Sequence, residues 1–425
     1  MNTKQTEIGE IPEDWEVVKL GDLLKPSIRK ESLSSNEYVS FIGMQDVSEN
    51  AELINQTPML FSDVKKGLTS FIRNDVLVAK ITPCFENGKG CYTENLKTEI
   101  GVGSTEFHVL RANDLADGKF VYFWTVQQSF REILTQEMVG SAGHKRVPFS
   151  SIQKFQIPLP SLPEQTAIAT ILSDTDRLLA ALRALIGKKR AVKTAAMQQL
   201  LSGSLRLPEF ATNGSLKNSE LGEIPEDWEV VKIGEFTDCT AGGTPSTAIP
   251  EYWNGDIPWM SSGELHLKQV YDVSGRITEL GLDNSSTSIV PEKSVLIGLA
   301  GQGKTRGTVA ISRIPLCTNQ SIAAVFPSNL FCSEYLFYNL ENRYEELRSL
   351  STGDGGRGGL NLTIIRNLAV PFPSLPEQTA IALTLSDMDS EIAALEARAA
   401  KLAQIKQGLM QNLLTGKIRV NTGAV

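Results

Sequence analysis

Gly298 to Thr305, GLAGQGKT, is the segment whose residue types and spacing point most directly to chemistry. It matches the phosphate-binding pattern G-x-x-x-x-G-K-[ST] letter for letter. In a nucleotide hydrolase such a loop begins a helix whose amide groups and dipole hold the phosphates. Here the next residues, Arg306 to Ser312, have the β-type sequence RGTVAIS. We therefore expect no nucleotide hydrolysis, and we interpret the glycines as a turn that presents Lys304 and Arg306.

Two other kinds of site are not supported by the sequence. The N/D-P-P-Y/F motif, typical of N6-adenine methyltransferases that hold a flipped base, does not occur. The cysteines form no CxxC pair and the histidines lie far apart, so we expect reduced thiols and no metal site. These residues are Cys84, Cys91, Cys239, Cys317, Cys332, His108, His144 and His266. The sequence thus predicts no catalytic residues, and the chain is expected not to be an enzyme.

Length and charge limit the class of protein. At 425 residues the chain suits two to four domains of roughly 100 to 200 residues. No apolar run approaches the roughly 18 residues that span a bilayer, and the N-terminus resembles no targeting signal, so we expect a cytoplasmic protein without membrane contact. The net charge is −8, but Glu7 to Leu24 and Glu220 to Thr237 each carry −5. The remaining chain is therefore +2, and nucleic acid is not excluded as a partner.

The same acidic segment occurs twice, 213 residues apart. EIGEIPEDWEVVKLGDLL at Glu7 to Leu24 returns as ELGEIPEDWEVVKIGEFT at Glu220 to Thr237, with 13 of 18 positions identical. PSLPEQTAIATIL at Pro160 to Leu172 returns at the same offset as PSLPEQTAIALTL at Pro373 to Leu385. A repeat on this scale indicates one structural plan used twice. We expect Trp15 and Trp228, one in each copy of the acidic segment, to be packing anchors.

Both PSLPEQ segments predict the start of a long helix. Ser161 and Glu164, like Ser374 and Glu377, have the spacing of a capping box. The helices are expected to run about 38 residues, to LLSG at Leu200 and LLTG at Leu413, and to pair antiparallel. Apolar residues recur at intervals of three, four or seven on both, and the stripe on the first is wide enough for a second partner. The expected partner-binding residues are Ile171, Leu178, Leu185, Val192, Leu385, Ile392, Leu395 and Leu402.

The regions between the repeated segments, roughly Lys25 to Ile157 and Asp238 to Val370, differ in sequence but share an order of elements. Short β-type runs alternate with turn residues, and one helical segment follows late in each region. Each then ends in a polar, glycine-rich loop, GSAGHKR at Gly140 and STGDGGRGGLN at Ser351. We predict two tandem mixed α/β (α+β) domains, separated by two long helices that form an antiparallel coiled coil with a pseudo-twofold repeat.

On these features the chain resembles the specificity subunits of type I restriction-modification systems, the HsdS family. The resemblance rests on the tandem arrangement, the IPEDWE segments, the paired helix starts and the LLTGKIR ending. It is supported by KITPCFENGKG at Lys80 and AGGTPSTAIPEYWNGDIPW at Ala241, which resemble segments of target recognition domains. The boundaries expected from it are 1–160 and 207–373 for two recognition domains, and 161–206 and 374–425 for the helices.

The resemblance implies a DNA-binding role without catalysis. Each recognition domain would read one half of a bipartite site in double-stranded DNA, and the helices would set the spacing of the half-sites. The helices would also dock two methyltransferase subunits (HsdM), and motor-nuclease subunits (HsdR) would join the restriction complex. S-adenosylmethionine, ATP and Mg are then expected in those partner subunits, with no cofactor on this chain. A coiled-coil scaffold without DNA affinity remains an alternative, although it would leave two unlike, loop-rich domains unexplained.

Candidate DNA-reading residues are polar side chains in loops of the two regions. Their chemistry follows from base-edge recognition, in which Arg or Lys suits guanine, Asn or Gln suits adenine, and a carboxylate accepts from cytosine. We regard Arg146 as the strongest candidate of the first region, because its guanidinium suits bidentate contacts. The others there are Lys80, Thr82, Glu86, Asn87, Lys89, Ser104, Thr105, Glu106, His144 and Lys145. Those of the second region are Gly243, Thr244, Ser246, Gln302, Lys304, Thr305, Arg306, Asn319, Gln320 and Arg357.

Overall fold

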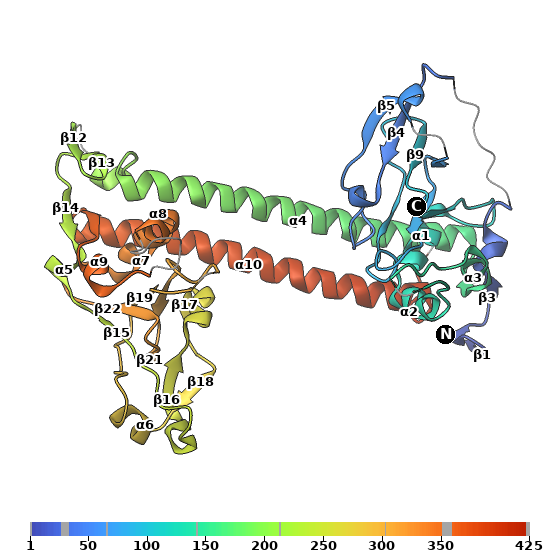
Figure 1. Cartoon of the computed structure of the whole chain (residues 1–425). Helices are drawn as coiled ribbons and strands as arrows, with labels where there is room; N and C mark the ends of the chain where they lie inside the picture. The colour runs from blue at the N-terminus through green and yellow to red at the C-terminus, as the bar shows by residue number, and fades with distance from the viewer. Residues whose placement is uncertain are drawn as a thin grey trace. The chain divides into compact units, whose positions relative to one another are not determined.

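The computed structural model divides the chain into two compact units (Figure 1). It describes residues 2–26, 34–64, 67–141, 143–211, 214–301, 303–350 and 359–421. Unit 1 comprises Met1–Arg183 and Ala397–Val425, and unit 2 comprises Ala184–Glu396. Each unit therefore combines one of the two differing regions with a part of each long helix.

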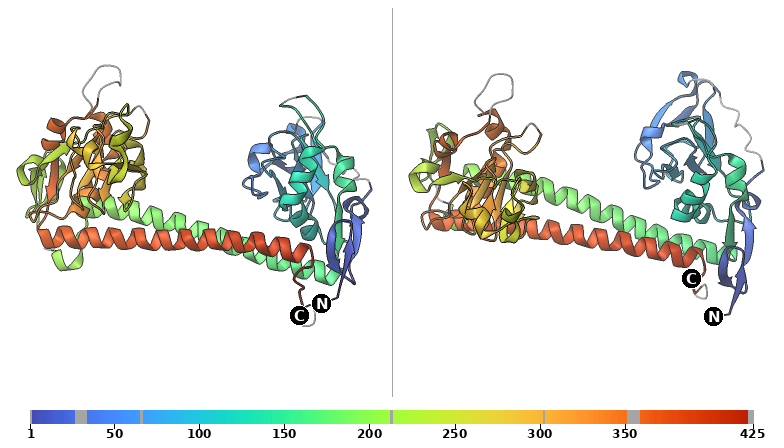
Figure 2. Two further views of the ribbon diagram at one scale, coloured as in Figure 1. Left: turned by 90° about the horizontal axis from the view of Figure 1, so that it is seen from below. Right: turned by 60° about the horizontal axis from the view of Figure 1, so that its bottom comes forward.

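The two long helices are α4 (Leu162–Ser202) and α10 (Leu375–Leu414). They begin within two residues of the predicted starts and end at the predicted LLSG and LLTG segments. Their paired parts are antiparallel in both units. Lys406 Nζ lies 2.5 Å from Asp176 Oδ1 in unit 1, and Lys193 Nζ lies 2.6 Å from Asp389 Oδ1 in unit 2. Figure 2 shows the two ribbons side by side within each unit, which confirms the predicted pairing.

Unit 1 is a mixed α/β domain. A hairpin of β1 (Thr3–Thr6) and β2 (Gly9–Pro12) precedes β3 (Glu16–Lys19), which pairs antiparallel with β11 (Gln156–Leu159). A four-stranded sheet has the order β5 (Thr57–Leu60), β4 (Tyr38–Ile42), β9 (Ile100–Gly103), β6 (Thr69–Ile72). A three-stranded sheet has the order β10 (Phe107–Leu110), β7 (Val76–Ala79), β8 (Gly90–Tyr92). The helices are α1 (Gly118–Val126), α2 (Gln128–Gln136) and α3 (Phe149–Lys154), with 3-10 turns at Leu20–Leu23, Met44–Asp46 and Phe61–Asp63.

Unit 2 has the same kinds of element in a different number. Its hairpin is β12 (Leu216–Ser219) with β13 (Gly222–Pro225), and β14 (Glu229–Lys232) pairs with β23 (Ala369–Phe372). A five-stranded sheet has the order β15 (Cys239–Ala241), β22 (Ile322–Val325), β19 (Val295–Gly298), β20 (Val309–Ser312), β17 (Gln269–Val270). A three-stranded sheet has the order β18 (Gly275–Ile277), β16 (Trp253–Met260), β21 (Cys317–Thr318). The helices are α5 (Ile233–Phe236), α6 (Glu279–Asp283), α7 (Ser333–Asn342), α8 (Tyr344–Ser349) and α9 (Leu362–Arg366), with 3-10 turns at Pro208–Phe210, Pro250–Tyr252 and Ser262–Leu267.

A buried ion-pair cluster holds the acidic segment of unit 1 to both long helices. Trp15 is fully buried, and its indole Nε1 donates to Glu164 Oε2 at the start of α4 over 3.2 Å. Arg419, which follows α10, donates to both oxygens of Glu164 over 2.5 and 2.7 Å. It also donates to both oxygens of Asp14 over 2.8 and 2.9 Å. The segment that follows α10 therefore packs against the chain's N-terminal segment inside one unit.

Unit 2 repeats this cluster residue for residue at the offset of 213. Trp228 Nε1 donates to Glu377 Oε2 over 3.1 Å, at the start of α10. Arg206, which follows α4, donates to both oxygens of Glu377 over 2.8 and 2.7 Å and to both of Asp227 over 2.9 Å. The predicted packing role of the two tryptophans is confirmed. The capping-box interpretation of Glu164 and Glu377 misses their main role, because both carboxylates are buried and bond the Arg and Trp of these clusters.

The glutamine next to each of these glutamates joins the common scaffold to the differing region. Gln165 Oε1 accepts from the amide of Asp117 just before α1 (3.0 Å), and Gln378 Oε1 accepts from the amide of Cys332 just before α7 (3.0 Å). Both glutamines are fully buried. The repeated PEQ sequence thus fixes the N-terminal end of a helix that differs in sequence between the units.

The GLAGQGKT segment does not begin a helix in the described residues. β19 ends at Gly298, and the chain returns as β20, which pairs antiparallel with β19. The expectation that a β-type segment follows is confirmed, and the helix N-terminus that a phosphate-binding loop requires is not formed. No helix among those described is long and apolar enough to cross a membrane.

Candidate nucleic-acid interface

In unit 1 the structure brings together three loop segments that are distant in sequence. The amide of Lys80 donates to Glu106 O over 2.9 Å, and the amide of Thr82 donates to Lys145 O over 3.0 Å. The amide of Val147 donates back to Lys80 O over 2.9 Å. These backbone bonds place the candidates Lys80, Thr82, Glu106 and Lys145 around one surface at the ends of β7 and β10.

An ion pair lies at the centre of this surface. Arg146 Nε and Nη2 donate to Glu106 Oε2 and Oε1 over 2.9 and 2.8 Å, a bidentate arrangement between two half-buried side chains. The hydrogen bond from Arg146 lowers the pKa of Glu106 below its ordinary value of 4.5. The guanidinium is therefore held in one orientation by a partner that was itself a predicted reading residue.

His108, which sequence reasoning did not select as a reading residue, contacts the residue that follows Arg146. Its Nε2 lies 2.8 Å from Val147 O, and its ring packs near Phe149 with centroids 5.4 Å apart. Burial is the largest influence and lowers its pKa. Nothing in the sequence around His108 indicates its contact with Val147, because this contact forms only on folding.

Three other candidates of the first region are already bonded internally. Asn87 Nδ2 donates to Glu49 Oε1 over 2.8 Å, and the half-buried Lys89 donates to Met44 O over 3.1 Å. Glu86 accepts from Thr82 Oγ1 through Oε1 over 2.8 Å, while its buried Oε2 has no hydrogen-bond partner among the described residues. These contacts make Lys89 and Glu86 less available to DNA than the sequence suggested.

The remaining candidates of the first region lie in turns. Ser104 Oγ accepts from the amide of Glu106 over 3.2 Å, so this hydroxyl stabilises the turn before β10. Thr105, His144 and Lys145 are exposed. The exposed side chains frame the Arg146–Glu106 pair and are free to approach a duplex.

In unit 2 the candidates near Gly243 and Gln320 also lie together. Thr244 Oγ1 donates to Gln320 Oε1 over 2.6 Å, and Asn319 Oδ1 accepts from the amide of Ser321 over 3.1 Å. Gly243 is buried and its amide donates to Thr318 O over 2.8 Å, so this amide is already bonded within the unit. A Cβ there would lie 2.3 Å from Ser286 Oγ, so close packing is the reason for the glycine. The exposed hydroxyls of Thr244 and Ser246 remain candidates.

The loop of unit 2 that carries Lys304 is supported by helix α8. Tyr344 Oη donates to Lys304 O over 3.1 Å, and Arg348 Nη1 donates to Gly303 O over 2.7 Å. Arg348 also lies over the Tyr344 ring at 5.5 Å. Lys304 is exposed, whereas Thr305 and Arg306 are half-buried. Two further candidates, Gln302 and Arg357, lie outside the described residues.

The predicted partner-binding residues fall into two groups. On α4, Leu178, Leu185 and Val192 have exposed fractions of 46%, 40% and 56%, while Ile171 is half-buried. On α10, Leu385 and Ile392 are buried in their own unit and Leu395 and Leu402 are half-buried. The neighbouring α4 residues Leu172, Leu179 and Ile186 are the buried ones. The exposed row on α4 is thus left uncovered within the units.

No group of His, Cys, Asp and Glu in the described ranges is placed to hold a metal ion. The five cysteines are free thiols, and burial raises the pKa of Cys91 to about 12. The geometry offers hydrogen-bonding and charged side chains suited to base edges and phosphates.

Comparison with known proteins gives a consistent result. The model of the family described as "Type I restriction modification DNA specificity domain" matches residues 12–188 and 225–407. The specificity subunit of the type I restriction enzyme MjaVIII of Methanocaldococcus jannaschii is 26% identical over 435 residues, covering 96% of this chain and 94% of that protein. The specificity subunit of the Escherichia coli type I enzyme EcoAI is 33% identical over 232 residues, covering 54% of this chain and 37% of that one. The solved S subunit of a type I restriction-modification system from M. genitalium has a similar fold, with a TM-score of 0.58 and 16% identity over 97% of this chain and 99% of that one.

Proposed function

The chain belongs to the family of type I restriction-modification DNA specificity domains, and from this premise we propose that each of its two units reads one half of a bipartite DNA target. The predicted resemblance is confirmed, and the chain is the DNA specificity subunit of a restriction-modification system, a subunit without catalytic activity of its own. Such a subunit binds DNA and assembles with other subunits of the system. The finer assignments that follow are our proposals.

The observation that carries the two-reader proposal is the repeated buried cluster. Arg419 in unit 1 and Arg206 in unit 2 form the same set of side-chain hydrogen bonds. The regions that these clusters support differ in sequence and in sheet order. A common scaffold that supports two different loop surfaces suits recognition of two different half-sites. For the domains we propose the boundaries 1–160 and 207–373, with the helical segments 161–206 and 374–425 as spacer.

In unit 1 we propose that the Arg146–Glu106 pair reads a G·C base pair in the major groove. Arginine suits the two acceptors of guanine, and a carboxylate accepts from the amino group of cytosine. Both side chains belong to loops fixed by backbone bonds, so they are oriented before DNA binds. Lys80 and Lys145 would contact phosphate, and Thr82, Ser104, Thr105 and His144 would complete the surface. Glu86, Asn87 and Lys89 would support it.

In unit 2 we propose that Thr244, Ser246, Asn319 and Gln320 contact the second half-site, with the amide side chains suited to adenine. Lys304, exposed on a loop anchored by α8, would contact phosphate. Thr305, Arg306, Gln302 and Arg357 are proposed for the same surface. Gly243 supports it through packing.

For the assembly we propose two methyltransferase subunits per chain and, in the restriction complex, motor-nuclease subunits. S-adenosylmethionine, ATP and Mg would bind those subunits, in the cytoplasm. The exposed α4 row of Leu178, Leu185 and Val192 supports docking on the helices, since uncovered apolar rows on a helix mark interaction surfaces. The lengths of α4 and α10 would set the spacing between half-sites.

A region exchange tests the proposal. Residues 238–370 are replaced by the corresponding region of another specificity subunit, and the adenines methylated in a host genome are mapped by single-molecule sequencing. We expect a bipartite motif in which one half-site changes and the other stays. If both half-sites changed, or the complex methylated without a bipartite motif, the two-reader proposal would be wrong.

A further inference from the structure

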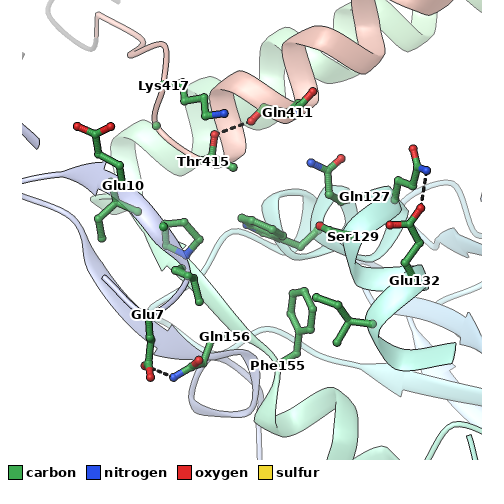
Figure 3. A pocket seen from close by; sticks show the side chains of 18 of the residues that line it. Glu7, Glu10, Gln127, Ser129, Glu132, Phe155, Gln156, Gln411, Thr415 and Lys417 are labelled. Atoms are coloured by element: carbon green, nitrogen blue, oxygen red, sulfur yellow. Dashed lines mark hydrogen bonds between the residues drawn. The ribbon is translucent and has the colours of Figure 1, made fainter. Parts of the chain in front are cut away.

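Unit 1 contains a groove of about 1250 Å³ that the recognition surface does not use. Three elements form its walls: the β1–β2 hairpin, helix α2 with the nearby Lys154–Pro158 segment, and the end of α10. Figure 3 shows lining residues from all three walls, among them Glu10 on the hairpin, Glu132 on α2 and Gln411 on α10. The volume exceeds that of small-molecule sites and is suited to a polypeptide segment. We call this feature the hairpin groove.

The charge of the hairpin groove argues against DNA as its occupant. Four glutamates line it, against two lysines, Lys154 and Lys417. Glu7 accepts from Gln156 and Glu10 from Thr3, and Glu132 accepts from Gln128 Nε2 over 2.6 Å. No described Lys or Arg forms an ion pair with these three carboxylates or with Glu137, the fourth. Uncompensated carboxylates repel phosphate and attract cationic side chains.

A second, independent observation points to a ligand. Trp124 lines the groove with 4% of its surface exposed, and its buried indole Nε1 has no hydrogen-bond partner among the described residues. Buried polar groups are nearly always bonded, and an orphaned donor destabilises the fold by about 1 to 3 kcal/mol. An occupant that supplies a carbonyl oxygen would remove this penalty.

The walls of the groove suit a polypeptide backbone. β1 and β2 form a two-stranded sheet, so each strand has an edge without a strand partner in the described part of the chain. Extended segments add to such edges through main-chain hydrogen bonds. Gln127, Gln128, Gln407 and Gln411 also line the groove, and each side-chain amide offers both a donor and an acceptor to a peptide group.

We propose that the hairpin groove binds an extended segment of the methyltransferase subunit that carries lysine or arginine side chains. This inference rests on the proposed function, because it takes the partner from the restriction-modification assembly. The basic side chains would lie along Glu10 and Glu132, and a backbone carbonyl would accept from Trp124. Such a contact adds a peptide-binding site to the docking surface on the helices and places it within one unit.

The test uses the full chain and the purified methyltransferase subunit in isothermal titration calorimetry at about 0.1 and 0.5 M salt. The variants are Glu10→Lys, Glu132→Lys and the double substitution Glu10→Lys/Glu132→Lys. The control, matched in charge to each single variant, is Glu13→Lys, an exposed residue of the same acidic segment that does not line the groove. We expect the double variant to raise the Kd at least about tenfold at low salt and less at high salt. Glu13→Lys should leave the Kd within about twofold.

Trp124→Phe provides a second variant that keeps the ring and removes only the N–H group. Because that group is orphaned in the free chain, the variant should be at least as stable as the wild type to heat. Loss of one hydrogen bond to the partner should still raise the Kd about threefold to tenfold. If the Trp124 N–H group had only a structural role, Trp124→Phe would lower the thermal stability and would not raise the Kd at unchanged stability.

The outcomes distinguish the groove from the function on which it rests. If the wild-type chain does not bind the methyltransferase subunit, the proposed function fails. If the wild type binds and the folded double variant binds within twofold of it, the groove is not the docking site and only this inference is overturned. A Glu13→Lys effect equal to that of the double variant would also overturn it, since the effect would then be one of net charge.

Discussion

The same substitution at the two equivalent arginines, Arg206 and Arg419, should destabilise the two units by different amounts. Arg206→Met removes the cation bonded to Glu377, and Arg419→Met removes the cation bonded to Glu164. Removing one partner of a buried ion pair destabilises a protein by about 3 to 5 kcal/mol, because the remaining charge stays buried. The Arg206 side chain is 11% exposed and the Arg419 side chain 32% exposed. Water therefore replaces more of the interaction at Arg419.

We expect Arg206→Met to lower the free energy of unfolding of unit 2 by about 3 to 5 kcal/mol. Arg419→Met should lower that of unit 1 by about 1 to 3 kcal/mol, after allowance for solvent screening. For a domain of this size each kcal/mol shifts Tm by about 2 to 4 °C, so unit 2 should melt roughly 6 to 20 °C lower in the first variant. Neither substitution should change the free energy of unfolding of the other unit.

Hydrogen exchange followed by mass spectrometry measures both effects, because peptides report the opening free energy of the unit in which they lie. Asp227→Asn is the matched control, since that carboxylate is 53% exposed and its loss should change stability by less than about 1 kcal/mol. The double variant Arg206→Met/Glu377→Met should recover part of the lost stability, because an apolar pair can replace a buried ion pair, although the Trp228 indole then loses its acceptor. A change below 1 kcal/mol for Arg206→Met, or protection lost first in unit 1, would refute the reasoning.

Three further predictions concern the loops that we propose to contact DNA and the long helices. Lys304→Ala should weaken DNA binding in a fluorescence anisotropy titration and reduce its salt dependence by about one phosphate contact, and the purified chain should show no ATP turnover for this change to abolish. Four residues inserted near Gly187 in α4, with a matching insertion near Glu396 in α10, should add about 6 Å. The preferred gap between half-sites should then lengthen by about one to two base pairs, and an unchanged gap in methylation mapping would show that the helices do not set it. The pKa of Glu106 is lowered by Arg146, so the stability this pair contributes is present above the ordinary value of 4.5 and is lost as pH falls through the lower folded value. The Tm difference between wild type and Arg146→Met should therefore shrink below about pH 4.5, and a difference that grew with acid would contradict the assignment.

The sequence by itself determined the scaffold. Repetition at a fixed offset identified two copies of one plan, and helix signals at Pro160 and Pro373 gave helix bounds close to those of α4 and α10. These features are predictable because helix starts and apolar periodicity depend on residues close together in the chain. The β-type sequence after GLAGQGKT likewise predicted a strand, and β20 confirms it.

Tertiary structure alone decided which side chains meet. Arg206 and Arg419 stand at equivalent positions of the repeat, but nothing local indicates that they bond Glu377 and Glu164, because those partners are 171 and 255 residues away. On α4 two adjacent apolar rows have the same spacing of seven, so periodicity could not tell that Leu179 is buried and Leu178 exposed. The pairing of Arg146 with Glu106 and the burial of Gly243 likewise depend on contacts between segments far apart in sequence.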